Sequence, residues 1–177
     1  MISTKKIKEI NFSDQIYFIP SYQRGYRWEN KQVIELLEDI YEVYSTQQDS
    51  YCLQPIVVSE IEPNKFEIID GQQRLTTIYI LLTRLKRYVD EKFQLDFQVR
   101  TNCILFFKNL DEGTLDYSNP DFAHISNAYS IINKWFEDKK KLRIDSNIEL
   151  NMFQTLLEKV EVIWYDVEEN LILRKHT

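Results

Sequence analysis

Apolar positions recur along the chain with two different spacings, which together predict a mixture of strands and helices. Short runs at 16–19, 51–59 and 66–69 are rich in β-branched and aromatic residues, as strands are. The turn at 62–65 is short enough to join the last two runs as an antiparallel hairpin. An alternating run at 160–167 predicts a further strand near the end of the chain.

Helical spacing of apolar side chains dominates the rest of the chain. It predicts helices over 31–45, from 72 to about 92, over 120–140 and over 149–157. Asn30 is the expected N-cap of the first of these helices. The expected buried face of that helix is Ile34, Leu37, Tyr41 and Tyr44, and the expected solvent-facing acids are Glu35, Glu38, Asp39 and Glu42.

Two segments give weaker patterns. Residues 1–15 are polar with weak alternation, so no regular element is predicted there. The apolar run Cys103–Phe107 is expected to be a strand. With these elements, the fold class expected from the sequence is α+β, a small mixed sheet with packed helices.

The composition restricts the classes of protein to which the chain belongs. A length of 177 residues fits one domain, or one domain with a helical extension. A net charge of −6 argues against a protein that binds nucleic acid through its overall charge, so any DNA contact is expected to use local patches. No apolar run approaches the roughly 18 residues of a membrane span, and no signal peptide is expected. We therefore expect no membrane partner and a cytoplasmic location.

Metal and disulfide chemistry find little support in the sequence. The two cysteines, Cys52 and Cys103, have no C-x-x-C spacing, and the chain contains only two histidines. This argues against a zinc site and against a disulfide framework. Both cysteines lie in apolar runs and are expected to be buried thiols.

A candidate anion site lies where the expected strand at 66–69 passes into the next helix. Gly71 permits a positive φ and a close approach of a ligand to the backbone. Gln72 and Gln73 would then present free N–H groups at a helix N-terminus, where phosphate commonly binds. Arg74 adds a fork of donors that suits phosphate, and Asp70 would hold a hydrated Mg²⁺ or orient a water.

The same residues also fit a purely structural interpretation. Asp70 would cap the helix by accepting a hydrogen bond from the N–H of Gln72 or Gln73. Arg74 would pair with Asp70 or with another surface acid. The hydroxyl of Thr76 would serve either a phosphate or the local backbone. Both interpretations stay open for this motif alone, because short motifs often match by chance.

A second candidate segment, 19–28, combines aromatic and guanidinium side chains. Tyr22, Tyr26 and Trp28 lie at even spacing and would share one face of an extended chain. Such a segment suits a phosphate, a base, or stacking on both. The alternative is an ordinary loop whose aromatic side chains pack on the core. The hydrogen-bond donors of the same segment are Gln23, Arg24 and Arg27.

The motif I-P-x-Y-Q-R-x-Y-x-W at 19–28 is followed by D-G-Q-Q-R-L-T-T at 70–77, with a helix and a hairpin between them. This ordered pair resembles the N-terminal domain family of GmrSD-type restriction endonucleases. The resemblance is strongest over about 10–90. It implies a fold similar to ParB and sulfiredoxin, with a nucleotide-binding core over 1–95 and a mainly helical extension over 96–177 that ends in a core strand and is truncated relative to the family.

The resemblance implies a role in bacterial defence against phage, with the D-G-Q-Q-R motif tied to binding and hydrolysis of a nucleoside triphosphate. Asp70 and Arg74 are then the expected catalytic residues, and Asp70 is also the expected Mg²⁺ ligand. The resemblance implies that Tyr22, Gln23, Arg24, Gln72 and Gln73 bind the nucleotide, and the strand–helix junction adds Gly71 and Thr76 as expected nucleotide-binding residues.

Three functions stay open at this point. The first is a nucleotide-dependent sensor that works with modified DNA and with a nuclease subunit or a missing C-terminal nuclease domain, because no H-N-H pattern is present. The second is a non-catalytic DNA-binding module, and the third is a scaffold for a partner nuclease. An exposed sheet edge would also favour a homo-oligomer. The expected DNA-contacting residues are Arg27, Trp28, Arg84 and Arg87.

Overall fold

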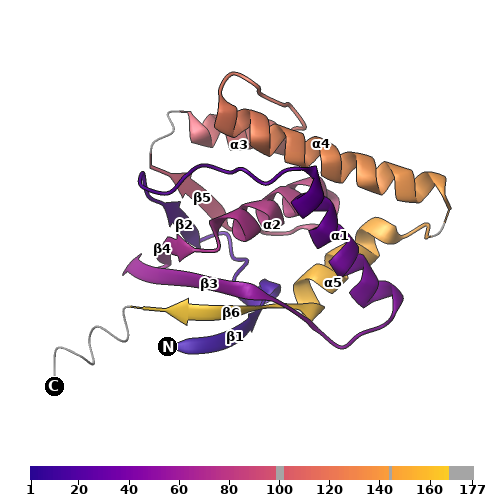
Figure 1. The fold of residues 1–177 in the computed structure, drawn as a ribbon, viewed down its shortest axis with the longest axis horizontal. Helices are drawn as coiled ribbons and strands as arrows, with labels where there is room; N and C mark the ends of the chain where they lie inside the picture. The colour runs from indigo at the N-terminus through magenta and orange to yellow at the C-terminus, as the bar shows by residue number, and fades with distance from the viewer. Residues whose placement is uncertain (99–101, 144, 168–177) are drawn as a thin grey trace.

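The computed structural model describes residues 1–98, 102–143 and 145–167. It has the mixed α/β architecture expected from the sequence (Figure 1). The elements in chain order are β1 (Ile2–Lys6), β2 (Ile16–Ile19), α1 (Asn30–Ser45), β3 (Tyr51–Glu62), β4 (Lys65–Asp70), α2 (Gln72–Arg84), β5 (Gln94–Phe97), α3 (Cys103–Asp111), α4 (Pro120–Lys141), α5 (Ile148–Lys159) and β6 (Val160–Asp166).

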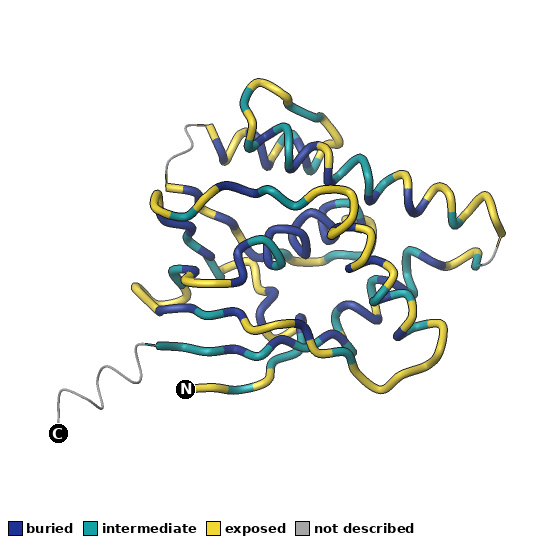
Figure 2. Tube along the Cα trace, viewed as in Figure 1, coloured by how far each residue is buried: buried dark blue, intermediate teal, exposed yellow. Residues whose placement is uncertain are grey.

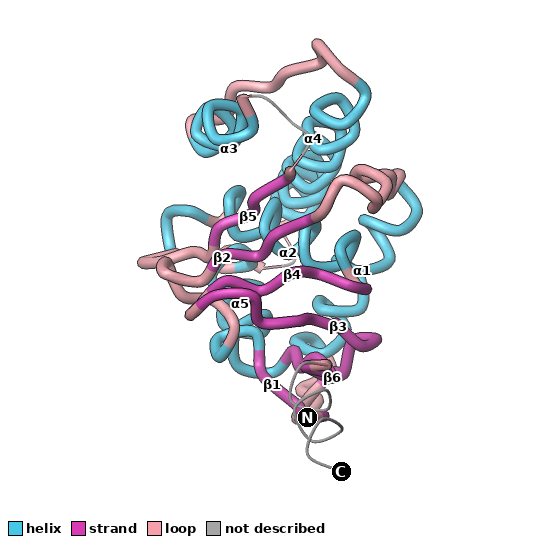
Figure 3. Tube along the Cα trace, turned by 90° about the vertical axis from the view of Figure 1, so that its left-hand side faces the viewer, coloured by secondary structure: helices cyan, strands magenta, loops and turns pink. Residues whose placement is uncertain are grey.

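A six-stranded mixed sheet organises the molecule, with the strand order β1-β6-β3-β4-β2-β5 (Figure 3). The expected antiparallel hairpin is confirmed, with Val58 of β3 opposite Ile68 of β4. β6 pairs parallel with β3 and antiparallel with β1. The parts of the chain before and after residue 95 therefore both contribute strands to one sheet. The expected boundary between a nucleotide-binding core and a helical extension at this position stays a prediction.

The hydrophobic core is made of side chains from the sheet and from the helices that pack against it. α4 packs against α1 and α2, and α5 packs against α1 (Figure 1). On the sheet, the ring of Tyr17 lies 5.1 Å from that of Phe93, 5.9 Å from Phe66 and 6.0 Å from Trp164. The buried hydroxyl of Tyr17 donates to the carbonyl of Ile10 at 2.8 Å, so this buried polar group is satisfied. Buried residues lie along the inner strands and on the helix faces that are turned toward the sheet (Figure 2).

The expectation of a strand over Cys103–Phe107 is wrong, because these residues begin the helix α3. The buried side chains of α3 are Cys103, Phe106, Phe107 and Leu110, which recur at helical spacing. Five apolar residues in a row hide this period, and it shows only when Leu110 is included. Cys52 is exposed, so the expectation of a buried thiol holds for Cys103 alone.

Two edge strands were not expected from the sequence. β1 lies within the supposedly irregular residues 1–15, and its Ile2 faces Tyr165 of β6. β5 forms beside β2, because α2 ends at Arg84 instead of near Lys92 and the chain then turns back to the sheet. Both strands are short, and their partners lie far away along the chain.

The buried face of α1 differs from the expected one by about one residue. Asn30 is the first helical residue rather than the N-cap, and the N–H of the preceding Glu29 donates to the side chain of Gln32 at 3.0 Å. Ile34 is 39% exposed. The side chains that are buried are Val33, Leu36, Leu37, Ile40 and Val43.

An ion-pair network fastens α2 to α4 and α5. Arg84 donates to Asn133 at 2.7 Å and to Glu149 at 2.8 Å, and Lys140 donates to Glu149 at 2.6 Å. The side chains of Arg84 and Glu149 are only 14% and 13% exposed. Arg84, an expected DNA-contacting residue, is therefore largely buried and bonded within the protein.

Replacement of Gly71 by alanine is expected to lower the free energy of unfolding by about 2–4 kcal/mol. Gly71 has φ +94°, and an added Cβ would lie 3.0 Å from Cγ1 of Ile56 and 3.2 Å from the carbonyl oxygen of Pro55. Gly113→Ala is the matched control, since Gly113 has φ +80° but its nearest neighbour atom is 3.9 Å away. Chemical denaturation should show a loss of about 1 kcal/mol for the control. Equal losses would contradict the contact with β3.

Glu149→Gln is expected to lower the free energy of unfolding at pH 7 by about 1.5–3 kcal/mol. Burial raises the pKa of Glu149, but the bonds from Lys140 and Arg84 outweigh it and hold the pKa below its usual value. A depressed folded-state pKa stabilises the protein above the unfolded pKa, and this stabilisation is lost as the pH falls through the folded pKa. The gap between wild type and variant should therefore shrink below about pH 4. Glu112→Gln, which changes an exposed carboxylate, is the control and should not alter the free energy of unfolding at pH 7.

Candidate functional site

A pocket of about 220 Å³ opens where β4 passes into α2. The segment 20–28, which connects β2 to α1, forms its other wall. The structure thus brings the two sequence motifs together at one place. The residues that line the pocket are Gln23, Arg24, Trp28, Asp70, Gly71, Gln72, Gln73 and Arg74.

The N-terminus of α2 faces this pocket without a side-chain cap. Its first backbone bond runs from the N–H of Leu75 to the carbonyl of Gly71 at 3.0 Å. Asp70 accepts a hydrogen bond from the N–H of Gly71 at 2.8 Å. The expectation that Asp70 caps Gln72 or Gln73 is therefore wrong, and the first N–H groups of α2 keep no side-chain acceptor among the described residues.

Two glutamines clamp the 20–28 segment onto the strand and the helix. The side chain of Gln73 donates to the carbonyl of Gly25 at 3.1 Å and accepts from the N–H of Arg27 at 2.8 Å. Gln23 reaches in the opposite direction and donates to two carbonyls at the end of β4, at 2.9 and 2.8 Å. These bonds give both glutamines a positioning role beside their expected contact with a nucleotide.

The three aromatic residues of this segment do not share a face. Tyr26 is fully buried, and its hydroxyl bonds Thr77 at 2.9 Å, while Thr77 donates to the carbonyl of Gln73 at 2.8 Å. Tyr22 is 73% exposed and donates to Glu67 at 3.1 Å, outside the pocket. Trp28 is half-buried at the pocket wall. The expectation of a common aromatic face is therefore wrong.

Buried polar atoms without a partner gather at the start of α2. The side chain of Gln72 is 4% exposed, and its oxygen accepts from Nε2 of Gln73 at 2.7 Å. This bond identifies the Nε2 of Gln72 as a donor, and it has no acceptor in the described chain. A buried donor without an acceptor costs about 1–3 kcal/mol. A ligand that offers oxygen atoms would remove this cost.

Arg74 links α2 to the neighbouring strand β3. Its guanidinium donates to the side chain of Gln54 at 3.1 Å and to the carbonyl of Pro55 at 2.6 Å, while its Nε is buried without a partner among the residues that the structure describes. No described carboxylate forms an ion pair with it, so the expected pairing with Asp70 or another surface acid is wrong. Burial lowers the pKa of Arg74, although the charge of Asp70 acts in the opposite direction.

These contacts on β3 have no signal in the sequence. Gln54 and Pro55 lie within an ordinary strand pattern, and they meet Arg74 only because β3 runs beside the start of α2.

The arginines near the pocket differ in whether their side chains are already bonded to other protein groups. Arg24 is exposed, lines the pocket, and has no hydrogen-bond or ionic partner among the described residues. Arg27 instead pairs with Asp121 of α4 at 2.5 Å. Arg87 is exposed beyond the end of α2, outside the pocket. Of the expected DNA-contacting residues, Trp28 lines this pocket, whereas Arg27, Arg84 and Arg87 do not.

Two further expected site residues differ in their suitability for ligand contact. Thr76 is fully buried and does not line the pocket, so its expected contact with a nucleotide is not available in this arrangement. Asp70 is exposed at the pocket edge. The described residues contain no group of three metal-ligating side chains. A single carboxylate still fits Mg²⁺ when phosphates and waters supply the other ligands.

Comparison with known proteins adds a family. The family model for the GmrSD restriction endonuclease N-terminal domain matches residues 6–174, and no curated protein matches the chain. Within the described ranges, no helix combines the length and apolar character of a membrane span. Because the match extends over nearly the whole sequence, the chain belongs to the GmrSD restriction endonuclease N-terminal domain family and is by that membership part of a restriction system.

Proposed function

We propose that this chain is a nucleotide-binding module that hydrolyses a nucleoside triphosphate within an anti-phage restriction system. One observation carries the proposal: at the uncapped N-terminus of α2, the buried amide donor of Gln72 and the neighbouring Arg24 have no partner in the described part of the chain. All of these groups donate hydrogen bonds or carry positive charge. Phosphate oxygens are the natural acceptors for such a set.

The phosphates would bind between α2 and the 20–28 segment. The N–H groups of Gln72 and Gln73 and the side-chain amide of Gln72 would donate to them from one side. Arg24 would reach them from the other, because it lines the same pocket from the facing segment. The chain has no lysine placed as in a Walker loop, so this mode of binding differs from that of P-loop enzymes.

Hydrolysis would use Asp70 at the edge of the pocket. A water oxygen would attack the γ-phosphorus while the bond to the β–γ bridging oxygen breaks, and the water proton would pass to the Asp70 carboxylate. Mg²⁺, when bound with the phosphates, would neutralise the charge that develops on them. The products are a nucleoside diphosphate and inorganic phosphate.

Arg74 has a double role in this proposal. Two of its donors hold Gln54 and Pro55 of β3, and only Nε is left for another acceptor. It is therefore a positioning residue as much as a charge for the phosphates. Arg74→Ala would disturb the fold and the site together, which makes Arg24 the better residue for a test.

The alternative, a non-catalytic DNA-binding or scaffold module, receives less support. Arg27 and Arg84 are held in ion pairs with Asp121 and Glu149. The remaining exposed cations near α2 are few, and the net charge is −6. Modified DNA, a nuclease subunit or domain, and a second copy of the chain are partners that we propose for the nucleotide-bound form.

Arg24→Ala is expected to weaken nucleotide binding by about 10- to 100-fold, because a charged hydrogen bond contributes about 1.5–3 kcal/mol. Calorimetric titration of GTP, ATP, CTP and UTP with Mg²⁺ measures this directly. The melting temperature should not change, since Arg24 has no partner in the described protein. Lys134→Ala, which removes an exposed cation of α4, is the charge-matched control. Unchanged affinity in Arg24→Ala would exclude the pocket as the phosphate site.

Asp70→Asn is expected to lower the rate of triphosphate hydrolysis by about 100-fold or more while the nucleotide still binds. The substitution keeps the side-chain oxygen that accepts from the N–H of Gly71, so the β4–α2 junction should stay intact. Release of inorganic phosphate under single-turnover conditions reports the chemical step. Hydrolysis at the wild-type rate would reject the role assigned to Asp70, whereas binding without turnover in the wild type would reject the NTPase and keep the nucleotide site.

A further inference from the structure

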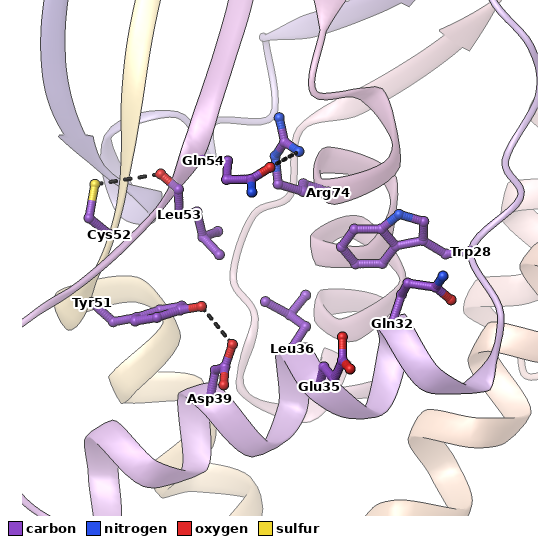
Figure 4. A pocket seen from close by; sticks show the side chains of 10 residues that line it. All are labelled: Trp28, Gln32, Glu35, Leu36, Asp39, Tyr51, Cys52, Leu53, Gln54 and Arg74. Carbon is purple, nitrogen blue, oxygen red and sulfur yellow. Dashed lines mark hydrogen bonds between the residues drawn. The ribbon is translucent and has the colours of Figure 1, made fainter.

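A second pocket, of about 240 Å³, lies between α1 and β3 (Figure 4). It adjoins the proposed phosphate pocket, because Trp28 and Arg74 line both. In Figure 4, Trp28 and Tyr51 lie at opposite ends of the pocket, with Leu36 between them. The two pockets therefore form adjoining compartments with a shared wall.

The charged side chains of the two compartments differ in balance. The phosphate pocket is lined by two cations, Arg24 and Arg74, by amide donors and by one carboxylate, Asp70. The second pocket is lined by two carboxylates, Glu35 and Asp39, by aromatic and aliphatic side chains, and by Arg74 at the shared wall. Carboxylates repel phosphate, whereas aromatic side chains stack on bases with about 1–3 kcal/mol per base. A nucleotide would therefore place its phosphates in the first pocket and its base in the second.

The hydrogen bonds that the polar side chains of the second pocket already make show which of their atoms remain as donors and which as acceptors. The oxygen of Gln32 accepts from the N–H of Glu29, and the oxygen of Gln54 accepts from Arg74, which leaves each amide nitrogen as a donor. Asp39 accepts from the hydroxyl of Tyr51 at 2.6 Å. Among the described residues, Glu35 forms an ion pair with Lys31 alone, at 4.0 Å. Glu35 is exposed, as expected, whereas Asp39 is half-buried, and both line this pocket.

We propose that the second pocket binds the base and ribose of the nucleotide, and that it selects guanine. This inference rests on the proposed binding of triphosphate at the start of α2. Guanine presents the adjacent N1–H and N2–H donors on one edge, which match the two oxygens of a carboxylate such as Glu35. Its O6 acceptor matches an amide donor of Gln32 or Gln54. Adenine, cytosine and uracil offer no such pair of neighbouring donor atoms.

The test is a calorimetric titration of the whole chain with GTP, ITP, ATP, UTP and inorganic tripolyphosphate, each with Mg²⁺. ITP lacks the N2 amino group and so isolates one of the two donors. GTP should bind at least about 10-fold more tightly than the other ligands. Glu35→Gln should reduce the affinity for GTP to about that for UTP and leave the affinity for tripolyphosphate unchanged. Glu42→Gln, an exposed carboxylate on the same helix outside the pocket, is the matched control and should change nothing.

The outcomes separate this inference from the proposed function. Equal affinities for all nucleotides and tripolyphosphate would overturn the base pocket and keep the phosphate site. No binding of any ligand would overturn both. A preference for GTP that survives in Glu35→Gln and in Asp39→Asn would overturn the selection by carboxylates. The second of these variants should still fold, because the new amide keeps an oxygen that can accept from the Tyr51 hydroxyl.

Discussion

The close contact of Gly71 with β3 determines where the rest of the site lies. The backbone leaves β4 with φ +94°, at a point where an added Cβ would meet the backbone and side chain of Ile56. Only a residue without a side chain fits both conditions without strain. Because this turn places the start of α2 directly against β3, Asp70, Gln72 and Arg74 come together at the carboxyl end of β4.

Within the two sequence motifs, some side chains hold the pocket together and others keep hydrogen-bond donors available for a ligand. Gln23 and Gln73 use their hydrogen bonds on the backbone of the neighbouring segment, and Tyr26 anchors the same segment in the core. Arg24 and Gln72 keep donors without a protein acceptor among the described residues. Departures from full hydrogen bonding are expected at functional sites, where another molecule completes the set.

The parts of the fold that the sequence predicts are those whose signal is local. The β3–β4 hairpin and the junction at Gly71 are each written in a few consecutive residues. β1 and β5 escaped prediction because short strands depend on distant partners, such as Tyr165 for Ile2. At the site, the sequence identifies the motif but not which of its side chains bond to the protein and which stay available for a ligand. The hydrogen bond of Gln73, for example, depends on Gly25, which lies 48 residues away along the chain.

The net charge of −6 gives a poor guide to what the chain binds, because the charges are separated in space. Arg24 lines one pocket, while Glu35 and Asp39 line the next, and Arg74 lies at the wall between them. The first pocket is lined by two cations and one carboxylate, and the second by two carboxylates and one cation. Adjoining pockets whose charges differ in this way orient a ligand that is itself polar in the same sense. A nucleotide, anionic at its phosphates and rich in N–H donors at a guanine base, has the matching polarity, and the overall charge of the protein carries no information about that match.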